Sequence, residues 1–201
     1  MADRVCEGCG QRLNLARSDA RTCSTKCRVR VHRAAKRAAE RAELARIAVD
    51  QVIPARMRER DRWMRWAPAR RGSRITKRPV TVAGAPASST NAATWSTYSE
   101  ARASEVGTGL GFALGDGIGC YDLDDALSGG VLEPWAAEFL ATIPEPVLFM
   151  EVSQSGNGVH AFIEAAEGPG RVIRDGRKIE RYTAGRFIAV TGAPFELGAT
   201  A

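Results

Sequence analysis

The chain has 201 residues, 44% of them hydrophobic, which suffices for one domain with a core plus a small appendage and excludes two large domains. No uncharged apolar run approaches the length of a membrane span, and no hydrophobic signal region opens the chain, so we expect a cytoplasmic protein without a membrane partner. The net charge of +6 is unevenly distributed. Up to Arg78 the sequence contains 22 Lys and Arg and 8 Asp and Glu, whereas from Pro79 onward it contains 7 Lys and Arg and 15 Asp and Glu. A basic first part suits a polyanion, or is a solvated helix, and an acidic second part suits divalent cations.

Four of the five cysteines lie within the first 27 residues, in two close pairs. The gaps of two and three residues between Cys6 and Cys9 and between Cys23 and Cys27 are typical of a tetrahedral Zn²⁺ site. With all four positions filled by thiolates, the predicted zinc site is structural rather than catalytic. Cys120 stands alone and is predicted to be a buried small hydrophobic residue.

A long helix is predicted from Ser24 to about Val52, because this stretch is rich in Ala, Arg and Glu, lacks Gly and Pro, and is followed by Pro54. Ser24 is its predicted N-cap. The helix would present a set of cations to phosphates, without base-specific readout. The predicted DNA contacts are Arg28, Arg30, Arg33, Lys36 and Arg37.

The remainder of the chain predicts an α+β body with a mostly antiparallel sheet. A helix is expected over 134–143, with Pro134 near its first position. The strands expected at 147–153 and 159–164 pair with each other, and those at 178–182 and 186–191 form a second hairpin. Two more strands are expected at 110–114 and 118–124.

The sequence Tyr121-Asp122-Leu123-Asp124 ends one of these strands. Since side chains alternate along a strand, Asp122 and Asp124 point to the same face. Two adjacent carboxylates repel each other, which divalent cations relieve, and paired cations serve phosphoryl transfer. A single Asp-x-Asp is nevertheless common outside metal sites.

Two further motifs are weaker by themselves. The small-residue turn from Ser153 to Gly158 leads directly to His160, which suits phosphate binding but also an ordinary hairpin with a hydrogen-bonded histidine. Glu180 would supply a third carboxylate if its strand lies beside that of Asp122, and is otherwise an exposed strand residue.

Taken together and in order, these motifs resemble the prim-pol (bifunctional DNA primase/polymerase) branch of the archaeo-eukaryotic primase superfamily, of the phage and plasmid type. The resemblance covers roughly 63–196. It rests on Trp63-Met64-Arg65-Trp66, Lys77 and Pro79, Thr94 to Tyr98, Gly109 to Asp124, Ser155 to His160, Glu180 to Tyr182, and Gly185 to Gly192. Gln154 and Asn91 depart from the family pattern, at positions without a role in chemistry.

The resemblance implies an enzyme, a nucleotidyltransferase with a catalytic core related to the RNA-recognition fold. Asp122, Asp124 and Glu180 would hold two catalytic Mg²⁺ or Mn²⁺ ions while a 3′-hydroxyl attacks the α-phosphate of a nucleoside triphosphate. The triphosphate would be contacted by His160, Ser155, Gly158 and Arg186, with Lys77 as a weaker candidate. The N-terminal unit resembles a treble-clef or ribbon-like zinc knuckle.

The expected function is therefore primer synthesis, and its extension, on a single-stranded DNA template in phage or plasmid replication, in the cytoplasm of a bacterial or phage-infected cell. The expected segments are a zinc knuckle (1–33), a basic helical arm (34–62) and a catalytic domain (63–201). A replicative helicase would be a separate partner. Two alternatives remain: a catalytically silent DNA-binding accessory protein and a metal-dependent nuclease.

Overall fold

The structure is a computed structural model that describes residues 4–13, 19–173 and 177–198. The chain divides into two compact units, 1–49 and 50–201, which are described separately. The fold is α+β with mostly antiparallel sheets, as predicted. No helix in the described ranges combines the length and the apolar composition needed to cross a bilayer.

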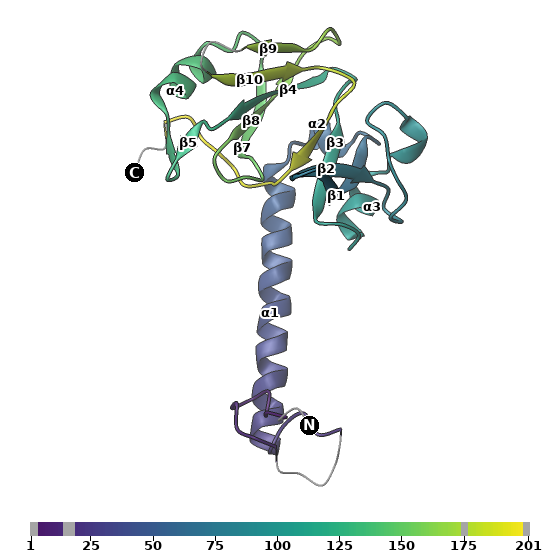
Figure 1. Cartoon of the computed structure of the whole chain (residues 1–201), viewed down its shortest axis with the longest axis vertical. Coiled ribbons are helices and arrows are strands. Elements are labelled where there is room, and N and C mark those ends of the chain that lie inside the picture. The colour runs from purple at the N-terminus through teal and green to yellow at the C-terminus, as the bar shows by residue number, and fades with distance from the viewer. Residues whose placement is uncertain (1–3, 14–18, 174–176, 199–201) are drawn as a thin grey trace. The chain divides into compact units, whose positions relative to one another are not determined.

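The first unit consists of the cysteine loops and most of helix α1 (Thr25–Val52), which Figure 1 shows as one continuous helix. The Ser24 hydroxyl accepts a hydrogen bond from the Cys27 amide at 3.2 Å, so the predicted N-cap is confirmed. The helix stops two residues before Pro54, because proline lacks the amide hydrogen and restricts the residue before it.

The second unit contains a four-stranded antiparallel sheet in the order β11-β3-β1-β2. Its core forms around Trp63, which is fully buried, contacts Tyr98 and Phe112 edge-on, and donates its indole N–H to the carbonyl of Met57. The elements of this half are α2 (Ala55–Arg58), β1 (Trp63–Arg71), β2 (Arg74–Val80), η1 (Ala92–Thr94), α3 (Tyr98–Ala103), β3 (Gly109–Ala113) and β11 (Phe187–Val190).

A five-stranded antiparallel sheet has the order β7-β8-β4-β10-β9. One face is packed with apolar side chains such as Tyr121, Leu123 and Ile163, and helix α4 (Pro134–Ala141) covers it through Ala136 and Leu140. The strands are β4 (Ile118–Asp124), β7 (Val147–Val152), β8 (Val159–Glu164), β9 (Arg171–Ile173) and β10 (Lys178–Tyr182), with a small β5 (Leu127–Ser128) and β6 (Val131–Leu132) ribbon beside them. The predicted pairing of β7 with β8 is confirmed.

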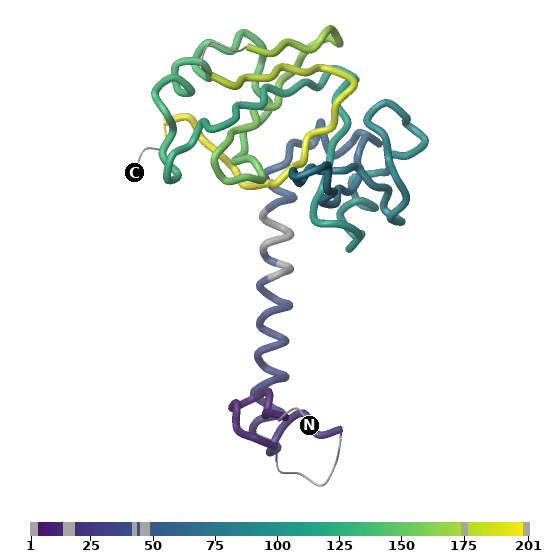
Figure 2. Tube along the Cα trace, in the orientation of Figure 1, coloured from purple at the N-terminus to yellow at the C-terminus, as the bar shows by residue number. Residues whose placement is uncertain are grey.

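The hairpin predicted from 178–182 and 186–191 is wrong. β10 pairs with β4, whereas β11 pairs with β3 in the other sheet, and Figure 2 lets the reader follow the chain from one sheet to the other. The physical reason lies upstream, at the Gly115-Asp116-Gly117 turn, where β3 and β4 part into different sheets. β10 and β11 each complete the backbone hydrogen bonds of one of these two strands, so they are not free to pair with each other.

Candidate functional site

Four ionisable side chains form a row across the five-stranded sheet. Asp122 lies directly opposite His160 on one side and opposite Glu180 on the other, and His160 lies opposite Glu151. Directly opposed residues of antiparallel strands point to the same face. The row therefore lies on the face away from the α4 core, since the neighbouring Tyr121 and Leu123 belong to that core.

Asp124 lies two residues along β4 from Asp122, on the same face as the row, and is exposed. Burial raises the pKa of Asp122, and the negative charges of Asp124 and Glu180 raise it further, whereas His160 and Lys77 oppose the shift. Lys77 on β2, in the other sheet, is thus close enough to act on Asp122. The structure brings together the three predicted carboxylates, the predicted histidine and the predicted lysine.

His160 is held between two carboxylates. Its Nδ1 lies 2.9 Å from Oε1 of Glu151, and its Nε2 lies 3.6 Å from Oδ1 of Asp122. The imidazole is only 2% exposed. The contact to Glu151 fixes the orientation of the ring, so that Nε2 lies on the side of Asp122.

Glu151 is a site residue that the sequence reasoning missed. It is fully buried, and its Oε2 accepts hydrogen bonds from the amides of Thr191 at 3.0 Å and Gly192 at 2.8 Å. These contacts hold the carboxylate against the imidazole. The available signal was a single acid inside the otherwise apolar sequence Val147-Leu-Phe-Met-Glu-Val, because a buried acid needs specific partners.

The small-residue turn between β7 and β8 is closely packed. The Ser153 amide donates to the Gly158 carbonyl at 2.8 Å, and the hydroxyls of Ser153 and Ser155 lie 2.9 Å apart. A Cβ at Gly158 would lie 2.7 Å from Ser153 Oγ and 2.8 Å from the Leu123 carbonyl, so only glycine fits. Asn157 donates to Asp125 at 2.9 Å and so links the turn to the end of β4. The turn therefore lies beside the Asp-x-Asp strand.

Arg186 lies at the start of β11 and packs on Tyr182. Its guanidinium carbon is 4.6 Å from the ring centroid, and its Nη2 donates to the Tyr182 hydroxyl at 3.0 Å. Tyr182 lies opposite Cys120, one row further along the face that carries Asp122. Cys120 itself is fully buried, and burial raises its pKa well above the ordinary value, as expected for an inert thiol.

Within the described residues, the thiolates of Cys6, Cys9, Cys23 and Cys27 form the one group of three or more candidate ligands close enough to share a single ion. Their sulfur atoms all lie within 4.8 Å of one another. The carboxylates of the row are more widely spread. They nonetheless fit cations, since they share one face, and burial together with the charges of Asp124 and Glu180 raises the pKa of Asp122.

The cysteine cluster is preorganised by the backbone. The Cys23 amide donates to Cys6 Sγ at 3.3 Å, which lowers the pKa of the Cys6 thiol to about 6, whereas thiol hydrogen bonds to Cys27 and Cys6 raise that of Cys23 to about 12. Gly8 permits the close packing of the first loop on the helix, because a Cβ there would lie 2.8 Å from Cys27 Cβ. Four converging thiols on a short loop and a helix start are a suitable cage for Zn²⁺.

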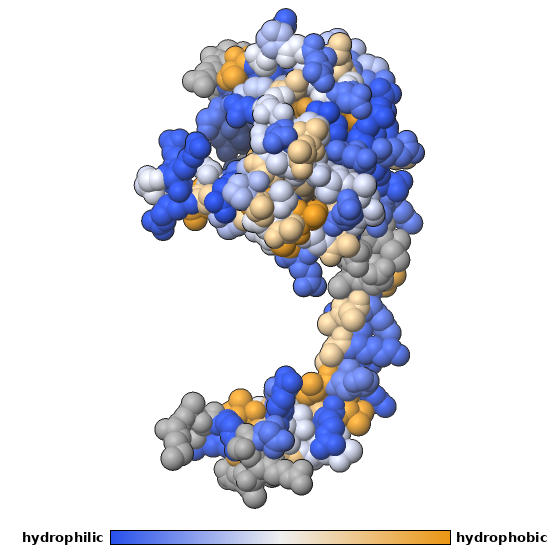
Figure 3. Space-filling model, turned by 90° about the vertical axis from the view of Figure 1, so that its right-hand side faces the viewer, coloured by the Kyte–Doolittle hydropathy of each residue, from blue (hydrophilic) through white to orange (hydrophobic). Residues whose placement is uncertain are grey.

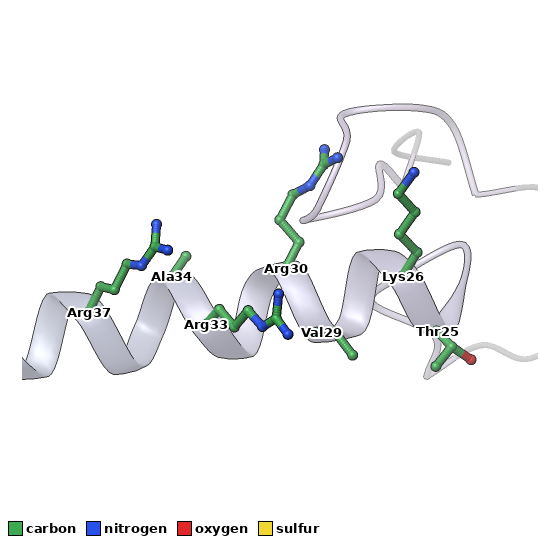
Figure 4. Close-up of a pocket in the computed structure, with 7 residues that line it drawn as sticks. All are labelled: Thr25, Lys26, Val29, Arg30, Arg33, Ala34 and Arg37. Carbon is green, nitrogen blue, oxygen red and sulfur yellow. The ribbon is translucent and has the colours of Figure 1, made fainter.

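The basic residues of α1 lie on more than one face. A groove of about 500 Å³ lies along the helix. Arg30, Arg33 and Arg37 are among the residues that line it, and Figure 4 shows their side chains. Arg28 instead lies with His32 along a second depression, beside the cysteine loops. Arg30 also donates to the Gly8 carbonyl at 3.0 Å, and Lys36 lies 3.9 Å from Glu40, so two of the five cations have intramolecular partners.

Comparison with known proteins supports the resemblance seen in the sequence. No family model matches the chain. A DNA primase-polymerase of Nitratiruptor phage NrS-1 is 32% identical over 146 residues, which are 67% of this chain and 19% of the relative. The chain thus spans about a fifth of the length of that relative. The similarity supports the prim-pol family and, in general terms, a primase or polymerase function.

Proposed function

We propose that the chain is a template-dependent nucleotidyltransferase that synthesises primers on single-stranded DNA. The observation that carries this proposal is the row Glu151, His160, Asp122 and Glu180, with Asp124 beside it, in a chain similar to a phage primase-polymerase. The antiparallel sheet with α4 on one face and the row on the other agrees with the RNA-recognition-like core that the resemblance implies.

Asp122, Asp124 and Glu180 would hold the divalent cations, Mg²⁺ or Mn²⁺. Their shared face and the raised pKa of Asp122 fit a site that is short of positive charge. When bound, such ions supply charge stabilisation to the attacking and leaving oxygens of phosphoryl transfer. The three carboxylates position this charge on the rigid central strands β4 and β10 rather than on a loop.

His160 would contact the phosphates of the incoming nucleotide through Nε2, and Glu151 is its positioning residue. Nδ1 lies 2.9 Å from Glu151, and Nε2 lies on the side of Asp122, where the bound triphosphate would lie. Fixing the ring through Glu151 avoids the loss of side-chain entropy on binding.

The triphosphate would lie between the Ser155 to Gly158 turn and two cations, Arg186 and Lys77. The turn offers small residues next to the end of β4, where Asp125 already binds Asn157. Arg186 is ordered by its contact with Tyr182, and Lys77 acts on Asp122. These cations would offset the negative charge that a triphosphate brings to an acidic site.

The first unit would bind DNA and leave catalysis to the second. Structural Zn²⁺ on Cys6, Cys9, Cys23 and Cys27 would hold the start of α1, whose cations contact template phosphates. The proposed contacts are Arg28, Arg30, Arg33, Lys36 and Arg37. A separate helicase would open the duplex.

The test is incorporation of labelled nucleotides on single-stranded DNA without a primer, in Mg²⁺ or Mn²⁺, with the intact chain and with Asp122→Ala/Asp124→Ala. We expect products only with the intact chain. A matched control is Asp116→Ala, since Asp116 lies in the turn before β4 and pairs with Arg60 away from the row.

The other outcomes separate the alternatives. A chain that binds single-stranded DNA but neither starts nor extends a strand under either metal would be the catalytically silent accessory. Degradation of the DNA, without binding of nucleoside triphosphates, would indicate the nuclease.

A further inference from the structure

Strands β1 and β2 continue beyond their sheet as a two-stranded ribbon. β3 pairs with β1 only over 63–66, whereas the pairing of β1 with β2 runs on to Arg71 and Arg74. Gly72 and Ser73 form the two-residue turn, with Gly72 at φ +59, as a hairpin turn of this kind requires. The ribbon is defined here as residues 67–78.

The ribbon is strongly basic. It contains no acidic residue and five exposed cations, which are Arg70, Arg71, Arg74, Lys77 and Arg78. These cations form no ion pair within the part of the chain that the structure describes. Ile75 stands among them with 74% of its surface exposed, the largest exposure among the large hydrophobic residues described. Figure 3 shows extensive hydrophilic (blue) areas on the visible surface of this unit, with paler areas and orange patches between them.

One face of the ribbon leads to the candidate site. Lys77 lies opposite Pro68, and Arg70 lies opposite Ile75, so these side chains share a face. Lys77 is the inner member, and its charge acts on Asp122. Ile75 and Arg70 lie two residues further out, about 7 Å along the strand. The face thus carries two cations and an exposed apolar side chain.

We propose that this ribbon binds single-stranded DNA next to the reaction centre. The arginines of both its faces would contact the phosphates, and Ile75 would lie against a base or sugar. A polyanion is the occupant that five unpaired cations complement, and the exposed apolar side chain favours unpaired bases over a duplex, whose bases are stacked. The location of the strand beside the reaction centre rests on the proposed function. The binding itself does not.

The test is the affinity of the intact chain for a fluorescent single-stranded oligonucleotide, measured by anisotropy across a salt series without nucleotide or metal. We compare Arg70→Gln/Arg74→Gln with the control Arg171→Gln/Arg177→Gln, which removes equal charge. Arg171 lies opposite Arg181, and Arg181 lies opposite Tyr121, so all three side chains are on the α4 side of the sheet. For two lost phosphate contacts we expect the slope of log affinity against log salt to fall by about 1.4, and the affinity by roughly tenfold near 0.1 M salt.

A third variant, Ile75→Ser, separates apolar contact from charge. It should weaken single-strand binding without changing the salt slope, and should leave duplex binding as it is. The substituted residues are exposed except Arg177, which is half-buried, and equal thermal melting of the variants establishes that the fold is intact. The proposal is overturned if Arg70→Gln/Arg74→Gln binds like the control, or if the ribbon variants lose affinity for duplex alone. Because this experiment measures binding and not catalysis, its result can be interpreted even if the chain proves to have no primase activity.

Discussion

Replacing Glu151 by glutamine tests whether this residue sets the state of His160. A glutamine can place its carbonyl oxygen where Oε2 now accepts from the Thr191 and Gly192 amides, so both backbone bonds persist. Its NH₂ group then faces Nδ1 of His160, where a carboxylate oxygen now lies at 2.9 Å. Since an NH₂ group only donates, Nδ1 must become an acceptor and the ring must carry its hydrogen on Nε2.

The expected cost to stability is modest for glutamine and large for alanine. Glu151→Gln exchanges a charge-assisted hydrogen bond for a neutral one, which costs about 1 kcal/mol. Glu151→Ala removes the partner of the Thr191 and Gly192 amides and of Nδ1 of the imidazole, at about 1–3 kcal/mol for each group. Glutamine is therefore the informative variant, because the protein should remain folded.

The chain contains two histidines, so ¹⁵N NMR of the imidazoles can resolve His160, with His32 as an internal reference. We expect the wild-type ring to carry its hydrogen on Nδ1. In Glu151→Gln the neutral ring should be the Nε2–H form. If His160 contacts the nucleotide as proposed, primer synthesis should fall roughly 10- to 100-fold in kcat, as for other positioning residues.

Glu145→Gln is the matched control for this experiment. Glu145 also accepts hydrogen bonds from neighbours, Arg181 at 2.6 Å and Tyr121 at 3.1 Å, but these lie on the α4 side of the sheet. It should lose stability without changing the His160 spectrum or the activity. Glu151→Gln with an unaltered His160 tautomer, or with activity equal to that of the control, would refute the reasoning.

Three further predictions concern cations and packing. In metal-free protein, Asp122→Asn should raise the unfolding midpoint at neutral pH. Burial raises the pKa of Asp122 in the folded state, so the ionised side chain destabilises the fold as the pH rises through that value. The gain from the substitution should therefore vanish below the ordinary pKa of 3.8. The same variant should abolish the midpoint increase that Mn²⁺ gives the wild type. Elemental analysis should find one Zn²⁺ per chain, lost in Cys27→Ser, and chelation should unfold the first unit while the melting of the second is unchanged. Gly158→Ala should destabilise the second unit by about 1–3 kcal/mol in denaturant titrations, because its Cβ would lie 2.8 Å from the Leu123 carbonyl. Gly156→Ala should cost less, because no atom lies within 4 Å of the added Cβ and only the φ of +83 is unfavourable.

Local patterns predicted the elements of the second unit and the residues that share a strand face. The alternation around Asp122 and Asp124 placed both on one face, and the turn residues after Val152 predicted the pairing of β7 with β8. These features depend on residues within a few positions of each other. For the same reason the pairing partners of β10 and β11 were mispredicted, since they depend on where β3 and β4 diverge, some 60 residues earlier.

Glu151 escaped prediction because its role exists only across strands. Nothing near it in the sequence indicates that Thr191 and Gly192, forty residues later, supply its backbone donors. The approach of Lys77 to Asp122 is of the same kind, since the two lie in different sheets. Side chains that act through long-range contacts have no local signature beyond an unusual residue type at a buried position.

The basic first part of the sequence is divided by the fold into two surfaces with different surroundings. Of the 22 Lys and Arg up to Arg78, 12 precede Asp50 and belong to the first unit, whereas 10 belong to the second, and half of those ten lie in the ribbon. The cations of α1 belong to the unit that carries the cysteine cluster, whereas the ribbon belongs to the unit that carries the carboxylate row. The ribbon is attached to the sheet next to β3, in the unit that carries the carboxylate row. If the ribbon binds the template as proposed, a phosphate held there is fixed relative to that row. Neutralising the ribbon should for this reason impair synthesis more than its share of the binding energy.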